Sequence, residues 1–239
     1  MAKNTVLLVE PRILERLPEV IHEFHTYLQD TWNYVFYCGK GTAEYWKDKV
    51  GSYVELRELD VTNFPSAHEY SWFMKQTALW NSLEGEFVLS IQADTWIMSI
   101  EPYTIDYFLH LNKSYIGGNM GYIWNEMRRE QLHPPYRNFN GGLSLRKRLD
   151  MLRITEAFPP TLTHSLPNNH TSDAEDVYFT IGCYRLGLPV GDDNASSHFA
   201  VHELSKDKMF GIHQPSRIAK DTYMRLYPEK GGRAPYCPG

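Results

Sequence analysis

A single carboxylate follows an apolar run in the first half of the chain. Residues 86–96 read EFVLSIQADTW, and the apolar stretch leads directly to Gln92, Ala93 and Asp94. The run is typical of a buried strand, and α/β folds place their chemistry at the carboxyl ends of such strands. Asp94 can hold a divalent cation against a diphosphate, because Mg²⁺ and Mn²⁺ prefer oxygen ligands and share them with substrate phosphates. An aspartate that caps a turn through its own backbone has the same sequence pattern.

Two later segments add further candidate groups. The sequence NGGLSLR begins at Asn140, and its glycines Gly141 and Gly142 permit close backbone approach and positive φ, although a tight turn entering a strand explains them as well. Further on, Glu175 and Asp176 open a predicted helix. A carboxylate at a helix start that faces a cleft is suitably placed to act as a general base. Acidic residues in a first helical turn also complement the helix dipole, with no chemistry involved.

Strands and helices alternate around these residues and must position them. This alternation over residues 5–96 predicts an α/β fold with a mostly parallel sheet, a nucleotide-binding half of the Rossmann kind. No GxGxxG follows the first strand, which argues against a dinucleotide dehydrogenase. The predicted strands are 5–9, 33–38, 53–59, the run ending at Asp94, 115–116, 143–145, 199–201 and 210–212. The predicted helices are 13–28, 42–49, 65–83, 103–111, 148–158 and 176–186.

The bulk properties exclude several classes of protein. The net charge is −5 with no basic stripe, so no nucleic acid partner is expected. No run of about 20 apolar residues and no signal segment is present, which predicts a soluble, cytoplasmic protein without a transmembrane segment. Three widely spaced cysteines without a CxxC pattern predict neither a disulfide framework nor a zinc site. The length of 239 residues suits a single domain.

Along the chain, the strand ending at Asp94 is followed by the paired glycines, the acidic helix start and a late histidine, His213. In this order the motifs resemble those of the GT-A family of glycosyltransferases, over about residues 5–215. The chain resembles in particular an uncharacterised group with a Gln-x-Asp version of the family's Asp-x-Asp motif, here Gln92-Ala93-Asp94. Gln92 departs from the family pattern, because it supplies a neutral amide in place of the first acidic residue, and this puts metal dependence in question. The resemblance implies a GT-A-type, Rossmann-like three-layer sandwich. Its nucleotide-binding half would span about 5–100 and its acceptor-binding half about 101–226, with an irregular tail at 227–239.

The resemblance also implies roles for individual residues. Asp176 would deprotonate the acceptor hydroxyl and Glu175 would contact the acceptor, while Asp94 and His213 would hold Mn²⁺ or Mg²⁺. His198 and His202 compete with His213 for that role. The donor-binding residues would be Glu10, Arg12, Lys75, Gln92, Asp94, Gly141 and Gly142.

Several neighbouring residues have two interpretations. Lys75 either contacts the donor or is simply solvated. Arg146 either faces phosphate or is a solvated charge at a helix start. Trp96 and Trp124 either stack on sugar faces or belong to the core. The aromatic segment at 119–139 is expected to be a substrate lid.

The implied activity is transfer of a sugar from a nucleoside-diphosphate sugar, such as a UDP-sugar, to a hydroxyl of a glycan or other acceptor. Metal assistance and inversion of the anomeric centre are expected. A retaining course stays open, since the acidic pair is assigned by resemblance. Two further alternatives are a sugar nucleotidyltransferase and a catalytically silent nucleotide- or glycan-binding module.

Overall fold

Three apolar runs and one strand of alternating polarity, β3, form the parallel part of a six-stranded sheet. They are β1 (Asn4–Glu10), β2 (Trp32–Cys38), β3 (Val54–Glu58) and β4 (Phe87–Ile91), and their mutual pairings are parallel. β1 and β4 are buried along nearly their whole length, which explains why they read as continuous apolar runs without polar alternation. The computed structural model describes residues 2–119, 139–160, 174–201 and 206–214, with the single positions 221, 225 and 228.

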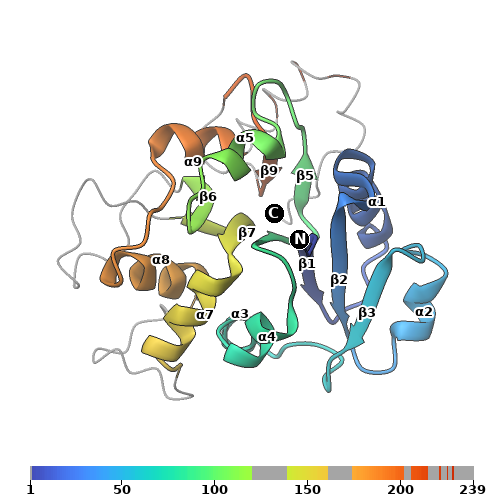
Figure 1. The fold of residues 1–239 in the computed structure, drawn as a ribbon. Coiled ribbons are helices and arrows are strands. Elements are labelled where there is room, and N and C mark those ends of the chain that lie inside the picture. Colours follow the sequence, from blue (N-terminus) through green and yellow to red (C-terminus); the bar gives the residue numbers. More distant parts are fainter. Residues whose placement is uncertain are drawn as a thin grey trace.

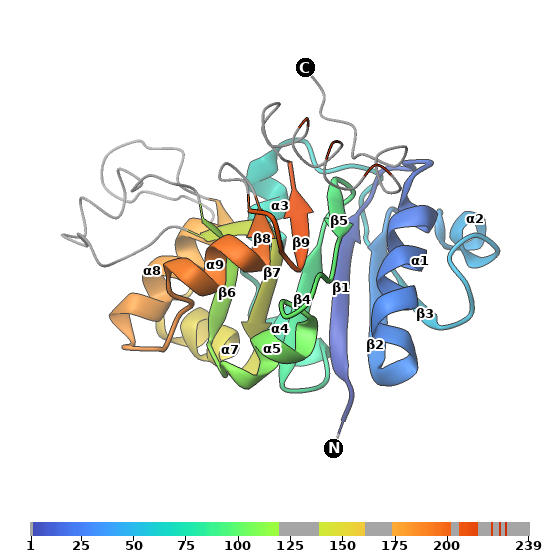
Figure 2. The same cartoon turned by 90° about the horizontal axis from the view of Figure 1, so that it is seen from above.

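Two further strands complete the sheet through antiparallel pairings, and of the six strands only β7 runs against the others. β7 (Phe139–Lys147) pairs antiparallel with β4, and β6 (Tyr115–Asn119) pairs antiparallel with β7. The strand order is β3-β2-β1-β4-β7-β6, which Figure 2 shows side by side. The predicted α/β fold with a mostly parallel central sheet is therefore confirmed.

Helices cover both faces of this sheet (Figure 1). The first face of the sheet packs against α1 (Leu17–Leu28), α2 (Ala43–Lys47), α5 (Ile105–His110) and α9 (Asp193–Phe199). The second face packs against α3 (Ala67–Met74), α4 (Thr77–Ser82), α7 (Arg148–Ala157) and α8 (Glu175–Arg185). A short 3₁₀ turn, η1 (Gln29–Thr31), joins α1 to β2.

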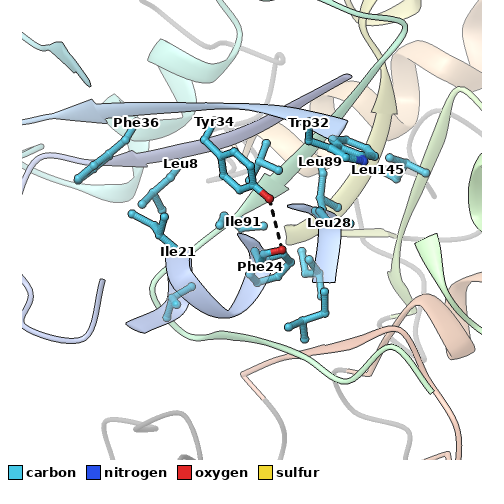
Figure 3. Packing of buried hydrophobic residues seen from close by; sticks show 14 of the residues in the cluster. Leu8, Ile21, Phe24, Leu28, Trp32, Tyr34, Phe36, Leu89, Ile91 and Leu145 are labelled. Atoms are coloured by element: carbon cyan, nitrogen blue, oxygen red, sulfur yellow. Dashed lines mark hydrogen bonds between the residues drawn. The ribbon is translucent and has the colours of Figure 1, made fainter. Parts of the chain in front are cut away.

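The first core lies between α1 and the parallel strands (Figure 3). Ile21, Phe24 and Leu28 recur at helical spacing along the buried face of α1, as the sequence predicts. The hydroxyl of Tyr34, on β2, donates a hydrogen bond of 3.3 Å to the carbonyl oxygen of Phe24. This bond satisfies the one polar atom that the tyrosine carries into the core.

A second, three-stranded sheet was predicted only in part, because the strands near 199–201 and 210–212 were expected but a separate strand at 95–97 was not. It has the order β5-β9-β8, with β5 (Thr95–Ile97), β9 (Gly211–His213) and β8 (Ala200–Val201). β5 directly follows Asp94, and its antiparallel pairing with β9 places Thr95 opposite His213. A segment 120 residues later in the chain thereby lies beside the end of β4.

The predicted helix at 65–83 is wrong as a single element. It is divided into α3 and α4 at Lys75 and Gln76, where Gln76 has an extended backbone conformation. The indole nitrogen of Trp80 donates a 2.8 Å hydrogen bond to the carbonyl oxygen of Met74, a group left free at the end of α3. The break is thus stabilised by a buried side chain, Trp80, which the apolar spacing does not reveal.

Three of the predicted segments fall largely outside the described residues. They are the aromatic loop at 119–139, the polar stretch at 159–172 and the tail from 227. In the part of the chain that the structure describes, no helix has both the length and the apolar character that crossing a bilayer requires.

The core beneath α1 generates a stability prediction. Phe24 is completely buried, so Phe24→Ala should lower the free energy of unfolding by about 3–5 kcal/mol through lost burial and a residual cavity. Leu149, on α7, is 58 % exposed, so Leu149→Ala should change it by less than about 0.5 kcal/mol. Urea unfolding of both variants measures the difference, and equal losses would contradict the assigned packing.

Candidate functional site

A cleft of about 980 Å³ opens at the carboxyl edge of the parallel strands. Its walls come from the end of β1, the connection to α1, the segment before and into α3, and the residues that follow β4. Side chains from separate strands meet there because parallel strands end at the same edge of a sheet. The polar lining includes Glu10, Arg12, Arg16, Tyr70, Gln92, Asp94 and Gln214, and the apolar lining includes Pro11, Ile13, Phe64 and Pro65.

Asp94 and His213 are brought together as predicted. The His213 Nε2 atom lies 3.3 Å from Asp94 Oδ1 and 3.1 Å from Gln92 Oε1. Gln214, the next residue, donates its side-chain amide to Asp94 Oδ2 at 2.5 Å. The contact follows from the pairing of β5 with β9, which holds the His213 backbone beside the residues that follow Asp94.

The surroundings of Asp94 favour its ionised form. Burial opposes ionisation, but the interactions with His213 and the hydrogen bond from Gln214 outweigh it and lower the pKa of Asp94 to about 2. The carboxylate is therefore charged at neutral pH. Its side chain is 21 % exposed, so it remains accessible from the cleft.

The donor atoms around His213 fit a divalent cation. A carboxylate oxygen, an amide oxygen and an imidazole nitrogen converge, and this set suits Mn²⁺ and also Mg²⁺. Two ligands at right angles on an ion with bonds of about 2.1 Å stand about 3 Å apart, close to the separations of 3.1 and 3.3 Å seen here. Among the described residues, no cluster of three His, Cys, Asp or Glu side chains is suited to a metal, so Gln92 would have to complete the set.

Tyr70, on α3, fixes the orientation of Gln92. The Gln92 Nε2 atom donates a hydrogen bond of 3.0 Å to the Tyr70 hydroxyl, and this turns Gln92 Oε1 toward His213. Burial and then the charge of Glu175 raise the pKa of Tyr70, with a smaller contribution from Asp176. The phenol of Tyr70 therefore contacts Gln92 and is also influenced by the charges of the acidic pair.

The paired glycines lie inside β7, so the alternative of a tight turn entering a strand is wrong, and neither glycine has a positive φ. Ser90 of β4 pairs with Ser144, so Gly142 and Gly141 lie beyond the carboxyl end of β4, at the level of Gln92. A Cβ atom on Gly142 would overlap the His213 imidazole, and one on Gly141 would overlap the Glu175 carboxylate. Glycine is thus required by close approach of side chains on both faces of the strand.

Arg146 is completely buried, and the alternatives of a phosphate contact or a solvated helix-start charge are both wrong. Its Nη1 and Nη2 atoms donate to the two carboxylate oxygens of Glu175 at 2.5 and 3.0 Å. Its Nε atom donates to the Ser144 hydroxyl at 2.9 Å, and Nη2 also reaches the Tyr115 hydroxyl at 3.3 Å. Glu175 is only 4 % exposed, and both of its carboxylate oxygens accept hydrogen bonds from Arg146.

Asp176 differs from its neighbour in its environment. Burial, followed by the charge of Glu175, raises the pKa of Asp176 to about 7, while hydrogen bonds from the backbone of Val177 and Gly141 oppose the shift. A carboxyl group that titrates near neutral pH can take up a proton at working pH, as a general base must. The two neighbours therefore differ: Glu175 is paired with Arg146, and Asp176 has a raised pKa.

The remaining predicted donor residues divide into two groups. Glu10 and Arg12 line the cleft, where Arg12 donates to both Glu10 carboxylate oxygens at 2.8 and 2.7 Å. Lys75 is 1 % exposed, so the alternative of a solvent partner is wrong, and its Nζ lies 5.6 Å from the centre of the Tyr178 ring. Lys75 is not among the residues that line the cleft.

Other candidates prove structural or lie elsewhere. Trp96 is buried in the core of the small sheet, which leaves no face for a sugar. His198 stacks on Tyr103 at 4.0 Å between ring centres, away from Asp94. Trp124 and His202 lie outside the described residues.

Sequence reasoning missed Tyr70, Gln214 and Arg16 in this site. Tyr70 read as one apolar member of a helix face, and Gln214 directly follows the predicted histidine. Arg16 precedes α1 without any motif around it. Tyr70 and Gln214 become recognisable only in the folded chain, because their partners Gln92 and Asp94 are distant in sequence. Arg16 becomes recognisable only as part of the wall of the cleft.

The Arg146–Glu175 pair generates a stability prediction. Glu175→Ala should lower the free energy of unfolding by about 3–5 kcal/mol, because it leaves the buried guanidinium unpaired. Glu44→Ala is the matched control, since its ion pair with Lys47 is exposed and worth less than about 1 kcal/mol. Urea unfolding at pH 7 compares them. In the double variant Arg146→Met with Glu175→Leu, part of the loss should return, and no recovery would contradict a cost that arises from the unpaired charge.

Asp176 generates a prediction that depends on pH. Its folded pKa is raised, so its contribution to stability is fully present below the unfolded value of about 4 and is lost as pH rises through about 7. Asp176→Asn should therefore raise the melting temperature at pH 8, by about 2–4 °C for each kcal/mol recovered, and change it little at pH 4. Circular dichroism measures both, with the exposed Asp30→Asn as control. An equal effect at the two pH values would contradict the buried, proton-accepting carboxyl.

Comparison with known proteins places the chain in a family. A search of curated proteins finds no match to it. The family described as "Protein of unknown function (DUF5672)" matches residues 53–214. This span contains Gln92, Asp94, the paired glycines, the acidic pair and His213, but it does not contain β1, α1 or β2. Because this span is more than half of the chain, the protein belongs to the DUF5672 family.

Proposed function

We propose that this protein is a glycosyltransferase that moves a sugar from a nucleoside-diphosphate sugar to an acceptor hydroxyl, with a divalent cation and with inversion of the anomeric centre. The observation that carries the proposal is the arrangement around Gly141 and Gly142. An ionised Asp94 with His213 and Gln92 lies on one side of this pair, and Asp176, with its raised pKa, lies on the other.

Glycosyl transfer requires a base for the acceptor hydroxyl and stabilisation of the departing diphosphate. Asp176 suits the first task, and Asp94 with His213 and Gln92 suits the second. The acceptor oxygen attacks the anomeric carbon and forms the new glycosidic bond, while the bond from that carbon to the diphosphate oxygen breaks. Asp176 takes the proton from the acceptor hydroxyl, and the diphosphate leaves with the bonding electrons. A carboxylate with a pKa near neutrality suits the first task, and a cation-binding group at the mouth of a cleft suits the second.

Three side chains would hold the cation. These are Asp94, His213 and Gln92, and the bound ion would offset negative charge on the departing diphosphate. Gln92 contributes an oxygen without a charge, so the set carries one negative charge fewer than an Asp-x-Asp motif would supply. Tyr70 holds the amide of Gln92 so that its oxygen faces the same point as the histidine nitrogen.

The cleft also has features that suit a nucleotide. Phe64, Pro11 and Ile13 provide apolar surface at one part of the lining, and Glu10 and Arg12 provide a fixed polar pair beside it. A planar base can pack on the apolar part while polar groups contact the ribose or phosphates. The volume of about 980 Å³ lies within the range of ligand sites in proteins, about 300–1,000 Å³.

The test combines donor binding with product formation. Melting temperatures of the wild type with nucleoside diphosphates and their sugar conjugates, with and without Mn²⁺, should identify one nucleotide class, since ligand at about 100 times its Kd adds about 2.7 kcal/mol. Asp94→Ala should lose the metal-dependent part of that shift. Asp176→Asn should keep the shift but form product about 10²–10⁴ times more slowly. Asp30→Asn is the control, because Asp30 is an exposed carboxylate just before the amino end of β2, at the edge of the sheet away from the cleft. This variant should behave as the wild type.

The outcomes separate the alternatives. Donor binding without transfer or hydrolysis across acceptors and metals would indicate a silent binding module. Pyrophosphate formed from a nucleoside triphosphate and a sugar phosphate would indicate a nucleotidyltransferase. Transfer at the wild-type rate by Asp176→Asn would remove that residue as the base, and the anomeric configuration of the product, measured by NMR, decides between inversion and retention.

A further inference from the structure

Arg16 is an unusual residue in the wall of the cleft. It is the residue immediately before α1, it is partly buried, and it lines the cleft with Arg12 and Asp94. Its Nε atom is fully buried and has no hydrogen-bond partner. Its guanidinium also forms no hydrogen bond or ion pair with any residue that the structure describes.

Burying an unpaired guanidinium nitrogen is costly, so the arrangement calls for an explanation. The nearby carboxylates do not supply one. Glu10 is engaged by Arg12, Asp94 is engaged by His213 and Gln214, and Glu15 forms no ion pair with Arg16. A guanidinium presents five donors in a planar fork that matches the oxygens of a phosphate group.

Arg12 adds a second guanidinium to the same wall. Glu10 holds it in place through the Nε and Nη2 atoms, while the Arg12 side chain remains 57 % exposed. The positive end of the α1 dipole lies at the same place, because Leu17 is the first residue of that 12-residue helix. The two arginines and the helix start together give one part of the cleft a surplus of hydrogen-bond donors.

We propose that Arg16 and Arg12 form an anion subsite in the cleft, and that its ligand is a diphosphate group of the kind carried by nucleotides. The inference deepens the proposed function, and it rests on that function only for the identity of the anion as part of a sugar donor. The unpaired donors of Arg16 point to an anion independently of Asp94 and of any metal. The subsite lies outside the span that matches the family, so it is a property argued for this chain alone.

The test measures metal-free binding of inorganic pyrophosphate by isothermal titration calorimetry. EDTA in the buffer removes any contribution from a cation at Asp94. Wild-type protein should bind, and Arg16→Gln should weaken binding by about tenfold or more, because a charge-assisted contact is lost. Arg16→Lys should fall between them, since it keeps the charge but loses the fork. Added salt should weaken wild-type binding more than it weakens binding by Arg16→Gln.

Arg153→Gln is the matched control, because it removes the same charge from an exposed position on α7. It should bind pyrophosphate as the wild type does, and circular dichroism should show that both glutamine variants fold. Wild-type binding by Arg16→Gln, or a complete lack of heat with the wild-type protein, would overturn the subsite. A lack of glycosyl transfer would overturn the proposed function while leaving this binding result in place, so the two failures are distinguishable.

Discussion

The buried ion pair between Arg146 and Glu175 is the interaction on which the arrangement of the site depends. Arg146 is enclosed by aromatic rings of three elements, Trp80, Tyr115 and Phe179, with its guanidinium carbon 5.9, 4.7 and 5.2 Å from their centres. A charge in such surroundings is tolerated only with a well-aligned partner. The carboxylate of Glu175 is that partner, and as the first residue of α8 it fixes where this helix begins against β7.

This constraint has consequences on both faces of β7. Glu175 approaches the strand so closely that position 141 has no room for a side chain, and His213 imposes the same restriction on position 142 from the other face. The next residue of α8, Asp176, is then held beside the Gly141 backbone, where burial, followed by the charge of Glu175, disfavours its ionisation and raises its pKa. The ion pair that supports the fold thereby also contributes to the proton affinity of its neighbour.

The order of strands and helices could be predicted from the sequence, because buried parallel strands read as apolar runs and helices as periodic ones. The proximity of Asp94 and His213 was also predictable, although only through the resemblance to the GT-A family. The pairing of Glu175 with Arg146 was not predictable, because the two residues are 29 positions apart in sequence. β5 and α9 were missed, since three residues and a polar heptamer carry too little periodicity, and their positions are set by tertiary pairing.

Hydrogen bonds on both sides of its amide explain how the site accommodates a glutamine at position 92. An ionised carboxylate there could not donate to the Tyr70 hydroxyl, and it would add negative charge near a phenol whose pKa is already raised by burial and by the charges of Glu175 and Asp176. The amide instead donates to the phenol, while its oxygen faces the ring nitrogen of His213. Gln92 thereby joins α3 to β9 without adding a charge to the group around Asp94.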